Sequence, residues 1–107
     1  MDDYIVIFTT TGSQEDAKKI AEHLVEMRLS ACVQVTGPIH SIYRWKDRIE
    51  NDEEWLCSIK SFKTYFGDVE RAIKEIHPYD VPEIVALPIV KGSSDYMMWL
   101  KDQLEPR

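Results

Sequence analysis

The sequence is poor in the residues that build glycine loops, disulfide frameworks and basic surfaces. Its 107 residues include only four glycines and two cysteines, and 13 Lys and Arg residues stand against 19 Asp and Glu residues. The chain therefore offers no glycine-rich phosphate loop and no CxxC or zinc-ribbon spacing. Its formal net charge of −6 makes nucleic acid and anionic membranes poor default partners, because both attract basic surfaces.

Long hydrophobic runs are also missing. The apolar stretch from Tyr4 to Phe8 is far too short for a signal peptide or a membrane span. We therefore expect a cytoplasmic protein. A hydrophobic content of 44% over residues 1–107 is sufficient to fill the core of one domain, so folding should require neither a disulfide nor a metal.

The first half of the chain predicts three elements. The β-branched run Tyr4–Thr10 is typical of a central strand, and apolar residues at helical spacing predict a helix over Ser13–Arg28, with Ser13 as its N-cap. From Ala31 to Trp45 the period changes to two, which predicts a long strand. Because proline cannot donate to a ladder, Gly37-Pro38 should bend this strand at a sheet edge.

The strand after the polar turn at Lys46–Arg48 is expected to return antiparallel to the first, forming a long hairpin. We expect the acidic stretch Glu50–Glu54 to precede this strand, because clear alternation begins only at Trp55 and continues to Ser61.

The last part of the chain predicts a helix, a strand and a short terminal helix. Apolar spacing favours a helix from Phe62 to Ile76 that ends before Pro78, and Glu83–Val90 is rich in β-formers. Pro88 suggests that this strand also lies at an edge. The terminal helix is predicted over Ser94–Leu104.

This order of elements predicts an α+β, ferredoxin-like βαββαβ fold with a long hairpin between its second and third strands and a short C-terminal helix. Both main helices would lie on one face of the sheet. The other face and the overhanging hairpin would be left uncovered, which favours a closed homo-oligomer.

Three segments are dense in functional side chains: residues 41–45, 58–61 and 77–83. A functional interpretation brings Lys60, His77, Tyr79 and a carboxylate together in a cleft between subunits. Structural roles are an alternative, because strand aromatics often pack in cores or interfaces and a histidine at a helix C-terminus interacts with the dipole. By chemistry, cysteine and histidine would favour copper or zinc, although their spacing predicts no metal site.

Other proteins of this fold have signatures that are missing here. An acylphosphatase-type loop would carry an arginine after the first strand, and a copper chaperone would carry MxCxxC there, whereas the chain has Thr9-Thr10-Thr11-Gly12. An RNA-recognition version would have aromatic and basic strand motifs, but Asp52-Glu53-Glu54 precedes Trp55.

Taken together, several motifs from Tyr4 to Leu100 resemble the divalent-cation tolerance family CutA. They are Ala31-Cys32-Val33, Ser41-Ile42-Tyr43-Arg44-Trp45, Lys60-Ser61, His77-Pro78-Tyr79-Asp80-Val81-Pro82-Glu83-Ile84 and Tyr96-x-x-Trp99-Leu100. One departure is Asp47, where the family hairpin usually has glycine; aspartate tolerates a left-handed conformation, so only the turn geometry is affected.

The resemblance implies a tight homotrimer and a role in tolerance of copper and other divalent cations. It suggests Cys32 and His77 as metal ligands, although the family has no agreed ligand set. The leading hypothesis is a cytoplasmic, non-enzymatic trimer that binds divalent cations. Five residues are predicted to line its intersubunit cleft as small-molecule contacts: Tyr43, Trp45, Lys60, Tyr79 and Glu83.

Three alternatives stay open. The family trimer resembles PII signalling proteins, so Lys60 and a protonated His77 could hold an anionic effector. The chain could also form a structural or adaptor trimer in which the same aromatics serve packing alone. A hydrolase is the third alternative, because histidine, tyrosine, lysine and glutamate can perform acid–base chemistry once they are placed together.

Overall fold

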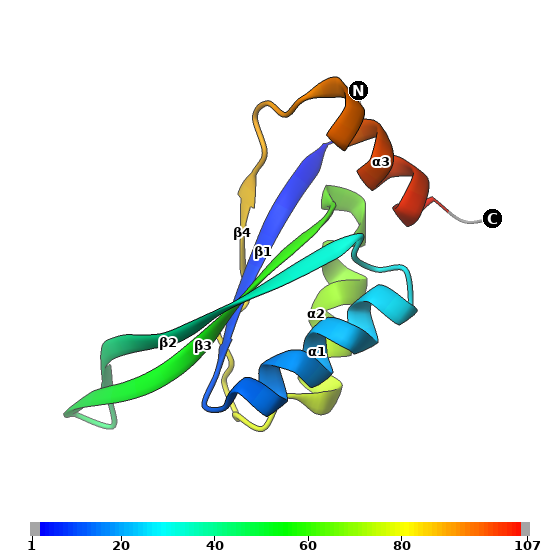
Figure 1. Cartoon of the computed structure of the whole chain (residues 1–107). Coiled ribbons are helices and arrows are strands. Elements are labelled where there is room, and N and C mark those ends of the chain that lie inside the picture. The colour runs from blue at the N-terminus through cyan, green and yellow to red at the C-terminus, as the bar shows by residue number, and fades with distance from the viewer. Residues whose placement is uncertain (1–2, 106–107) are drawn as a thin grey trace.

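The computed structural model describes residues 3–105 as a four-stranded antiparallel sheet with helices against it (Figure 1). The elements are β1 (Tyr4–Thr11), α1 (Gln14–Glu26), β2 (Cys32–Trp45), β3 (Arg48–Phe62), the 3-10 helix η1 (Lys63–Tyr65), α2 (Phe66–Ile76), β4 (Val85–Pro88) and α3 (Ser94–Leu104). The strand order is β2-β3-β1-β4, and every neighbouring pair is antiparallel. The predicted α+β, ferredoxin-like fold is confirmed.

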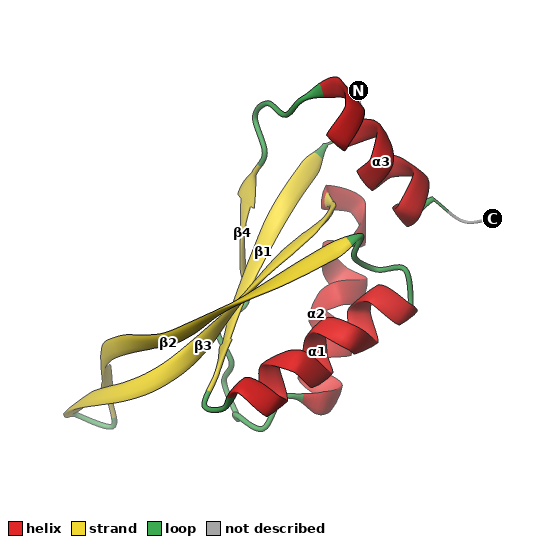
Figure 2. Cartoon of the chain, viewed as in Figure 1, coloured by secondary structure: helices red, strands yellow, loops and turns green. Residues whose placement is uncertain are grey.

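Helices α1 and α2 cover one face of the sheet, and α3 lies across one end (Figure 2). Alternate residues of β1 and β3 point toward the helices and form the main core, in which Ile7 and Ile59 meet Leu24 and Ile73 with no exposed surface. A second cluster joins α3 to the end of the sheet through Tyr4, Phe62, Met97, Leu100 and Leu104. No helix within residues 3–105 is long and apolar enough to cross a bilayer.

The ends of α1 follow from local chemistry. The Ser13 side chain accepts a hydrogen bond from the backbone N–H of Asp16 at 3.1 Å, which confirms the predicted N-cap. The helix ends at Glu26 rather than at the predicted Arg28, because Arg28 adopts a left-handed conformation with φ of 58° and the chain turns there.

The hairpin formed by β2 and β3 is longer than the alternation pattern predicted. The acidic stretch Glu50–Glu54 lies inside β3, so its predicted place before the strand is wrong. Asp52 and Glu53 are exposed, and no apolar alternation marks that half of the strand. The register shifts between Thr36 and Ile39, as predicted for a bend at Gly37-Pro38 on an edge strand.

A two-residue turn connects the hairpin strands. Lys46 and Asp47 both have positive φ, 50° and 63°, which is the geometry of the hairpin turns that match strand twist. Aspartate thus occupies a left-handed position, which its short polar side chain tolerates.

Two further element boundaries differ from prediction. Phe62 ends β3 instead of starting a helix, because its ring packs against Tyr4, 5.3 Å away between centroids. The last strand is shorter than expected: only Val85–Pro88 pairs as a strand with β1, and β4 lies at the edge of the sheet, as Pro88 indicated.

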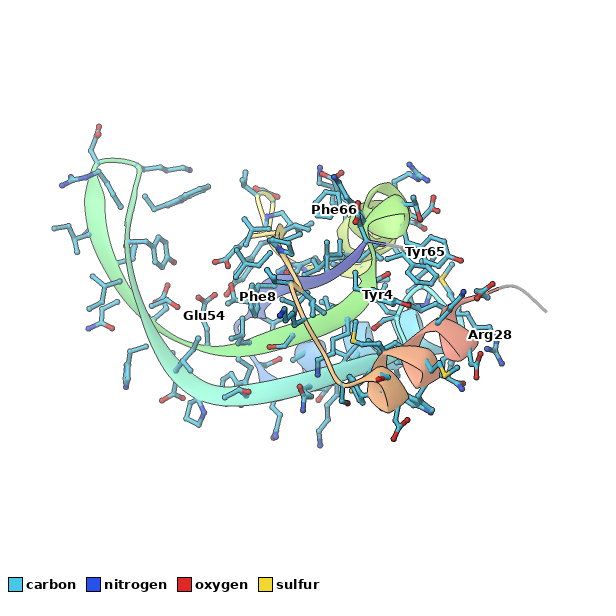
Figure 3. The ribbon with its side chains drawn as sticks, turned by 90° about the horizontal axis from the view of Figure 1, so that it is seen from above. Tyr4, Phe8, Arg28, Glu54, Tyr65 and Phe66 are labelled. Carbon is cyan, nitrogen blue, oxygen red and sulfur yellow. The ribbon has the colours of Figure 1, made fainter. Side chains whose placement is uncertain are left out.

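The face of the sheet opposite α1 and α2 carries apolar side chains without a covering layer from those helices. Val85 and Leu87 of β4 on this face are about half exposed, and Ile42 and Ile49, on the other face of the hairpin, are each 70% exposed. Seen from above, the hairpin curves as it leaves the core, and Glu54 lies inside the curve (Figure 3).

Candidate functional site

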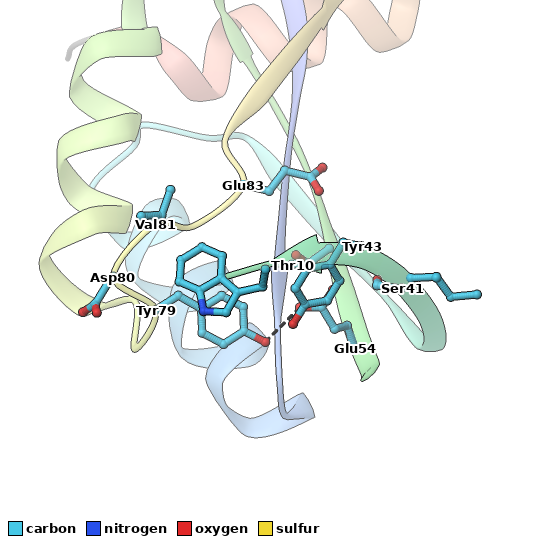
Figure 4. Close-up of a pocket in the computed structure, with 10 residues that line it drawn as sticks. Thr10, Ser41, Tyr43, Glu54, Tyr79, Asp80, Val81 and Glu83 are labelled. Carbon is cyan, nitrogen blue, oxygen red and sulfur yellow. Dashed lines mark hydrogen bonds between the residues drawn. The ribbon is translucent and has the colours of Figure 1, made fainter. Parts of the chain in front are cut away.

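A cavity of about 600 Å³ lies on the concave side of the hairpin. The end of β1, both strands of the hairpin and the loop that precedes β4 contribute its walls. The residues that line it are Thr10, Ser41, Ile42, Tyr43, Trp45, Glu54, Tyr79, Asp80, Val81 and Glu83. Figure 4 shows the loop residues facing the hairpin residues across this space.

Glu54 is the buried charge of the cavity. Only 6% of its surface is exposed, and its Oε2 accepts a hydrogen bond from the Tyr79 hydroxyl at 2.8 Å (Figure 4). Burial and the bond to Glu54 raise the pKa of Tyr79 well above its ordinary value. The Tyr79 phenol therefore stays protonated and remains a hydrogen-bond donor at neutral pH.

Tyr43 makes a similar bond further along the hairpin. Its hydroxyl donates to Oδ2 of Asp52, and this bond raises the pKa of Tyr43 to about 12. Because Ser41 pairs with Asp52 and Tyr43 pairs with Glu50, the acidic residues of β3 at even numbers share a face with the aromatic residues of β2 at odd numbers.

His77 holds the loop rather than pointing into the cavity. The helix α2 ends at Ile76, and the His77 ring receives the backbone N–H of Tyr79 on Nδ1 at 3.0 Å. Nε2 therefore carries the proton and donates to the Thr10 carbonyl at 2.7 Å. Both ring nitrogens are engaged, and the ring lies beside that of Tyr79, with centroids 4.8 Å apart.

The predicted metal ligands are not assembled within one chain. Cys32 pairs with Lys60, which pairs with Val6, whereas His77 binds Thr10 further along β1. Within residues 3–105, no group of three or more His, Cys, Asp and Glu side chains is placed to hold a metal ion. The donor set of a single chain therefore does not fit a metal.

The other cysteine is a core residue. Cys57 has no exposed surface, its Sγ donates to the Ala17 carbonyl at 3.6 Å, and burial raises the pKa of the thiol to about 11. Since thiolate is the form that binds metals, Cys57 is a poor ligand.

Four of the five predicted small-molecule contacts, Tyr43, Trp45, Tyr79 and Glu83, line the same cavity. Lys60 does not. Its Nζ donates to Oε1 of Gln34 at 2.8 Å and lies 5.6 Å from the centre of the Tyr96 ring, on another part of the sheet.

Glu54 is the cavity residue that sequence reasoning missed. The sequence placed it in the acidic stretch Glu50–Glu54 before the strand, and acidic residues are usually solvated. The signal was present nevertheless, because extending the two-residue period back from Leu56 places Glu54, Asp52 and Glu50 on one face of the strand.

The strand order and the two helices on one face define a ferredoxin-like α+β protein. Its β2–β3 hairpin extends beyond the core and carries the cavity. The family model described as CutA1 divalent ion tolerance protein matches residues 5–103. The chain belongs to this family.

Individual relatives agree over most of the chain. It is 43% identical over 97 residues to a divalent-cation tolerance protein CutA of Thermus thermophilus, covering 91% of this chain and 94% of that one. It is 38% identical over 98 residues to the chloroplastic protein CutA of Arabidopsis thaliana, covering 92% of this chain but only 54% of the relative. The crystal structure of CutA1 from Oryza sativa superposes with a TM-score of 0.94 at 33% identity, covering 99% and 97% of the two chains.

Proposed function

We propose that this protein is a cytoplasmic, non-enzymatic homotrimer that binds divalent cations, copper in particular, in metal tolerance. The observation that carries the proposal is the position of Cys32. It is a free, partly exposed cysteine at the start of an edge strand, opposite Lys60, on the face that α1 and α2 leave open. A donor placed there is available to meet donors of another subunit.

Assembly is supported by the uncovered surface. The open face exposes Val85 and Leu87, and the other face of the hairpin exposes Ile42 and Ile49. Association is favoured when a subunit interface removes such apolar side chains from water. The number of subunits, three, follows from the family resemblance. Light scattering at micromolar concentration should give three times the chain mass of 12.5 kDa, and a monomer would contradict the proposal.

The choice of copper rests on the donor chemistry. A cysteine thiolate prefers soft and borderline ions over magnesium or calcium, which bind oxygen ligands. His77 can act as the second predicted ligand only by releasing Thr10 or Tyr79, because both of its nitrogens are engaged. We therefore expect Cys32 to contribute more to cation affinity than His77.

Calorimetric titration with copper on the assembled protein tests this proposal. Cys32→Ser should weaken binding by about tenfold or more, since a thiolate ligand is lost. His77→Ala should have a smaller effect, and Cys57→Ala, which removes a buried thiol, is the matched control and should bind as wild type does. Absence of copper binding by the wild type would remove the metal function, and unchanged affinity in Cys32→Ser would remove that residue as a ligand.

The cavity also favours a second function, that of a small-molecule sensor of the PII-like kind. Within one chain Lys60 and His77 do not meet, and the cavity is lined by carboxylates, so an anionic effector held by Lys60 and His77 would need residues of two subunits. A thermal-shift screen tests the function, since a ligand at 100 times its Kd stabilises the protein by about 2.7 kcal/mol. A screen of anions and cations without a stabilising compound would contradict it.

The cytoplasmic location is a prediction of the same proposal. The relative from Arabidopsis thaliana is named chloroplastic, so location differs within the family and does not follow from membership. Fractionation of the producing cells tests the prediction, and recovery of the protein outside the cytoplasm would contradict it.

A further inference from the structure

The buried carboxylate of Glu54 has no cationic partner. Among residues 3–105 no salt bridge includes Glu54, and the Tyr79 hydroxyl on Oε2 provides its single hydrogen bond. Oε1 accepts no hydrogen bond within residues 3–105, and it is not one of the fully buried atoms that lack a partner. This oxygen is therefore reachable from the cavity, where a cation with N–H donors can form a charge-assisted hydrogen bond with it.

Aromatic rings form the walls around this carboxylate. Tyr43 and Trp45 come from the hairpin and Tyr79 from the facing loop. Faces of aromatic rings attract cations, and the attraction grows when water is excluded. The two phenols keep their protons at neutral pH, because hydrogen bonds to carboxylates and, for Tyr79, burial raise the pKa of each.

The charged residues that line the cavity are acidic. Glu54 and Glu83 belong to the walls, with Asp80 at the outer edge and turned away from the rings (Figure 4). No Lys, Arg or His residue belongs to this lining within the described part of the chain. Anionic ligands are therefore repelled.

The ligand chemistry follows from the shape of this donor set. A divalent metal needs several oxygen, nitrogen or sulfur ligands in a fixed geometry, and within residues 3–105 the carboxylates of this lining are not grouped in threes as a metal site requires. A primary ammonium group instead carries three N–H donors, which suit the free oxygen of Glu54 and the hydroxyls of Thr10 and Ser41. Val81 adds apolar surface from the loop for the rest of the molecule.

We propose that this cavity binds a protonated primary amine with an apolar stem, its ammonium group on Glu54 and its stem against the rings of Tyr43, Trp45 and Tyr79. This site is separate from Cys32 and requires no metal. The proposal adds an organic cation to the divalent cations of the proposed function. Amine binding at this site does not depend on the binding of divalent cations.

Isothermal titration of the assembled, metal-free protein with phenethylammonium chloride tests the proposal. Glu54→Gln should weaken binding by about tenfold or more, since it removes the charge while its amide oxygen still accepts from Tyr79. Glu53→Gln is the matched control: Glu53 is exposed, precedes Glu54 on the same strand and faces the opposite side. It should bind as wild type does.

A second variant and two further probes complete the experiment. Trp45→Leu, at a half-exposed position, should also weaken binding while circular dichroism and assembled mass stay unchanged. The anion 3-phenylpropionate should not bind, and tetramethylammonium, which has no N–H donor, should bind more weakly than phenethylammonium.

Three results would overturn the proposal. They are equal affinity of wild type and Glu54→Gln, binding of 3-phenylpropionate at the same strength, and no amine binding at millimolar concentration. The last is the expected result if a second copy of the chain fills the cavity on assembly. Because no metal is added, each of these results leaves the copper titration of the proposed function to be decided separately.

Discussion

The interactions that stabilise the sheet differ between its two ends. At the compact end, defined as the part of the sheet under α1 and α2, side chains such as Ile7 and Ile59 have no exposed surface. In the hairpin arm, defined as residues 39–54, Ile42 and Ile49 are 70% exposed. The same residue type on the same sheet therefore contributes core packing at one end and, within its own chain, cross-strand pairing at the other.

The largest expected effect is at the compact end. Ile7→Ala should lower the free energy of unfolding by about 2–5 kcal/mol, because it removes buried methyl groups and leaves a cavity between β1 and the helices. Urea denaturation followed by circular dichroism measures this change.

Ile49→Ala in the arm is the matched comparison. Ile49 has little packing of its own chain to lose, so any effect should act through assembly and depend on protein concentration. If Ile7→Ala lowers the free energy of unfolding by less than about 1 kcal/mol, which is below the usual cost of truncating a buried isoleucine, the compact end does not dominate stability.

Cys57 gives the compact end a pH dependence. In the folded state burial raises the pKa of this thiol to about 11, so the unfolded chain releases the proton first. The free energy of unfolding should therefore be unaffected well below pH 9 and fall as the pH rises from about 9 to 11, by about 2–3 kcal/mol in total.

The difference between wild type and Cys57→Ala isolates this effect. The variant keeps the tyrosines, which also titrate in the alkaline range, and loses only the thiol. Denaturation at several pH values gives the two curves. Parallel curves from pH 8 to 11 would contradict the assignment.

Gly37 lies where the arm leaves the compact end, beside the register shift. A Cβ added there would overlap the indole ring of Trp55, which packs against the main core. Gly37→Ala should therefore cost about 1–3 kcal/mol through overpacking. Thermal unfolding measures this cost, and Trp55→Leu should relieve it if the ring is the cause; a cost that persists in the double variant would implicate the backbone instead.

The smallest expected effects compare two hydroxyl groups. Ser61 at the compact end is fully buried and donates to the Leu29 carbonyl at 2.7 Å, so Ser61→Ala should cost about 1–2 kcal/mol. Tyr43→Phe in the arm removes an exposed hydroxyl and should leave the unfolding midpoint unchanged. Equal costs in denaturant titration would remove the distinction between the two ends.

The same contrast explains how far the sequence predicted the fold. Where one face is buried, alternation and helical spacing are strong signals, and β1, α1 and the order of elements along the chain were predicted. Where both faces are mostly exposed, as in residues 48–53, hydrophobic periodicity disappears and the strand was placed too late. Phe62 was misplaced because its spacing fits a helix, while packing on Tyr4 keeps it in the strand.

The candidate site was predicted in part for a similar reason. Tyr43, Trp45, Tyr79 and Glu83 were found from motifs, and the fold brings them around one cavity. Glu54 was missed because an acidic residue is usually solvated, and its burial depends on the loop that crosses it. Lys60 was grouped with them from the motifs, but in the fold it pairs with Cys32 and donates to Gln34, away from the cavity.

The two-residue turn at Lys46 and Asp47 bears on how this hairpin can change over evolution. Side chains alternate between faces, so lengthening each strand by one residue at the turn adds a pair and leaves all earlier pairings in phase, whereas a single extra residue in one strand requires a bulge or inverts a face. The hairpin arm can therefore gain or lose pairs of residues during evolution without changing which side chains face the core. The tip is also a natural place to insert a tag or graft a peptide.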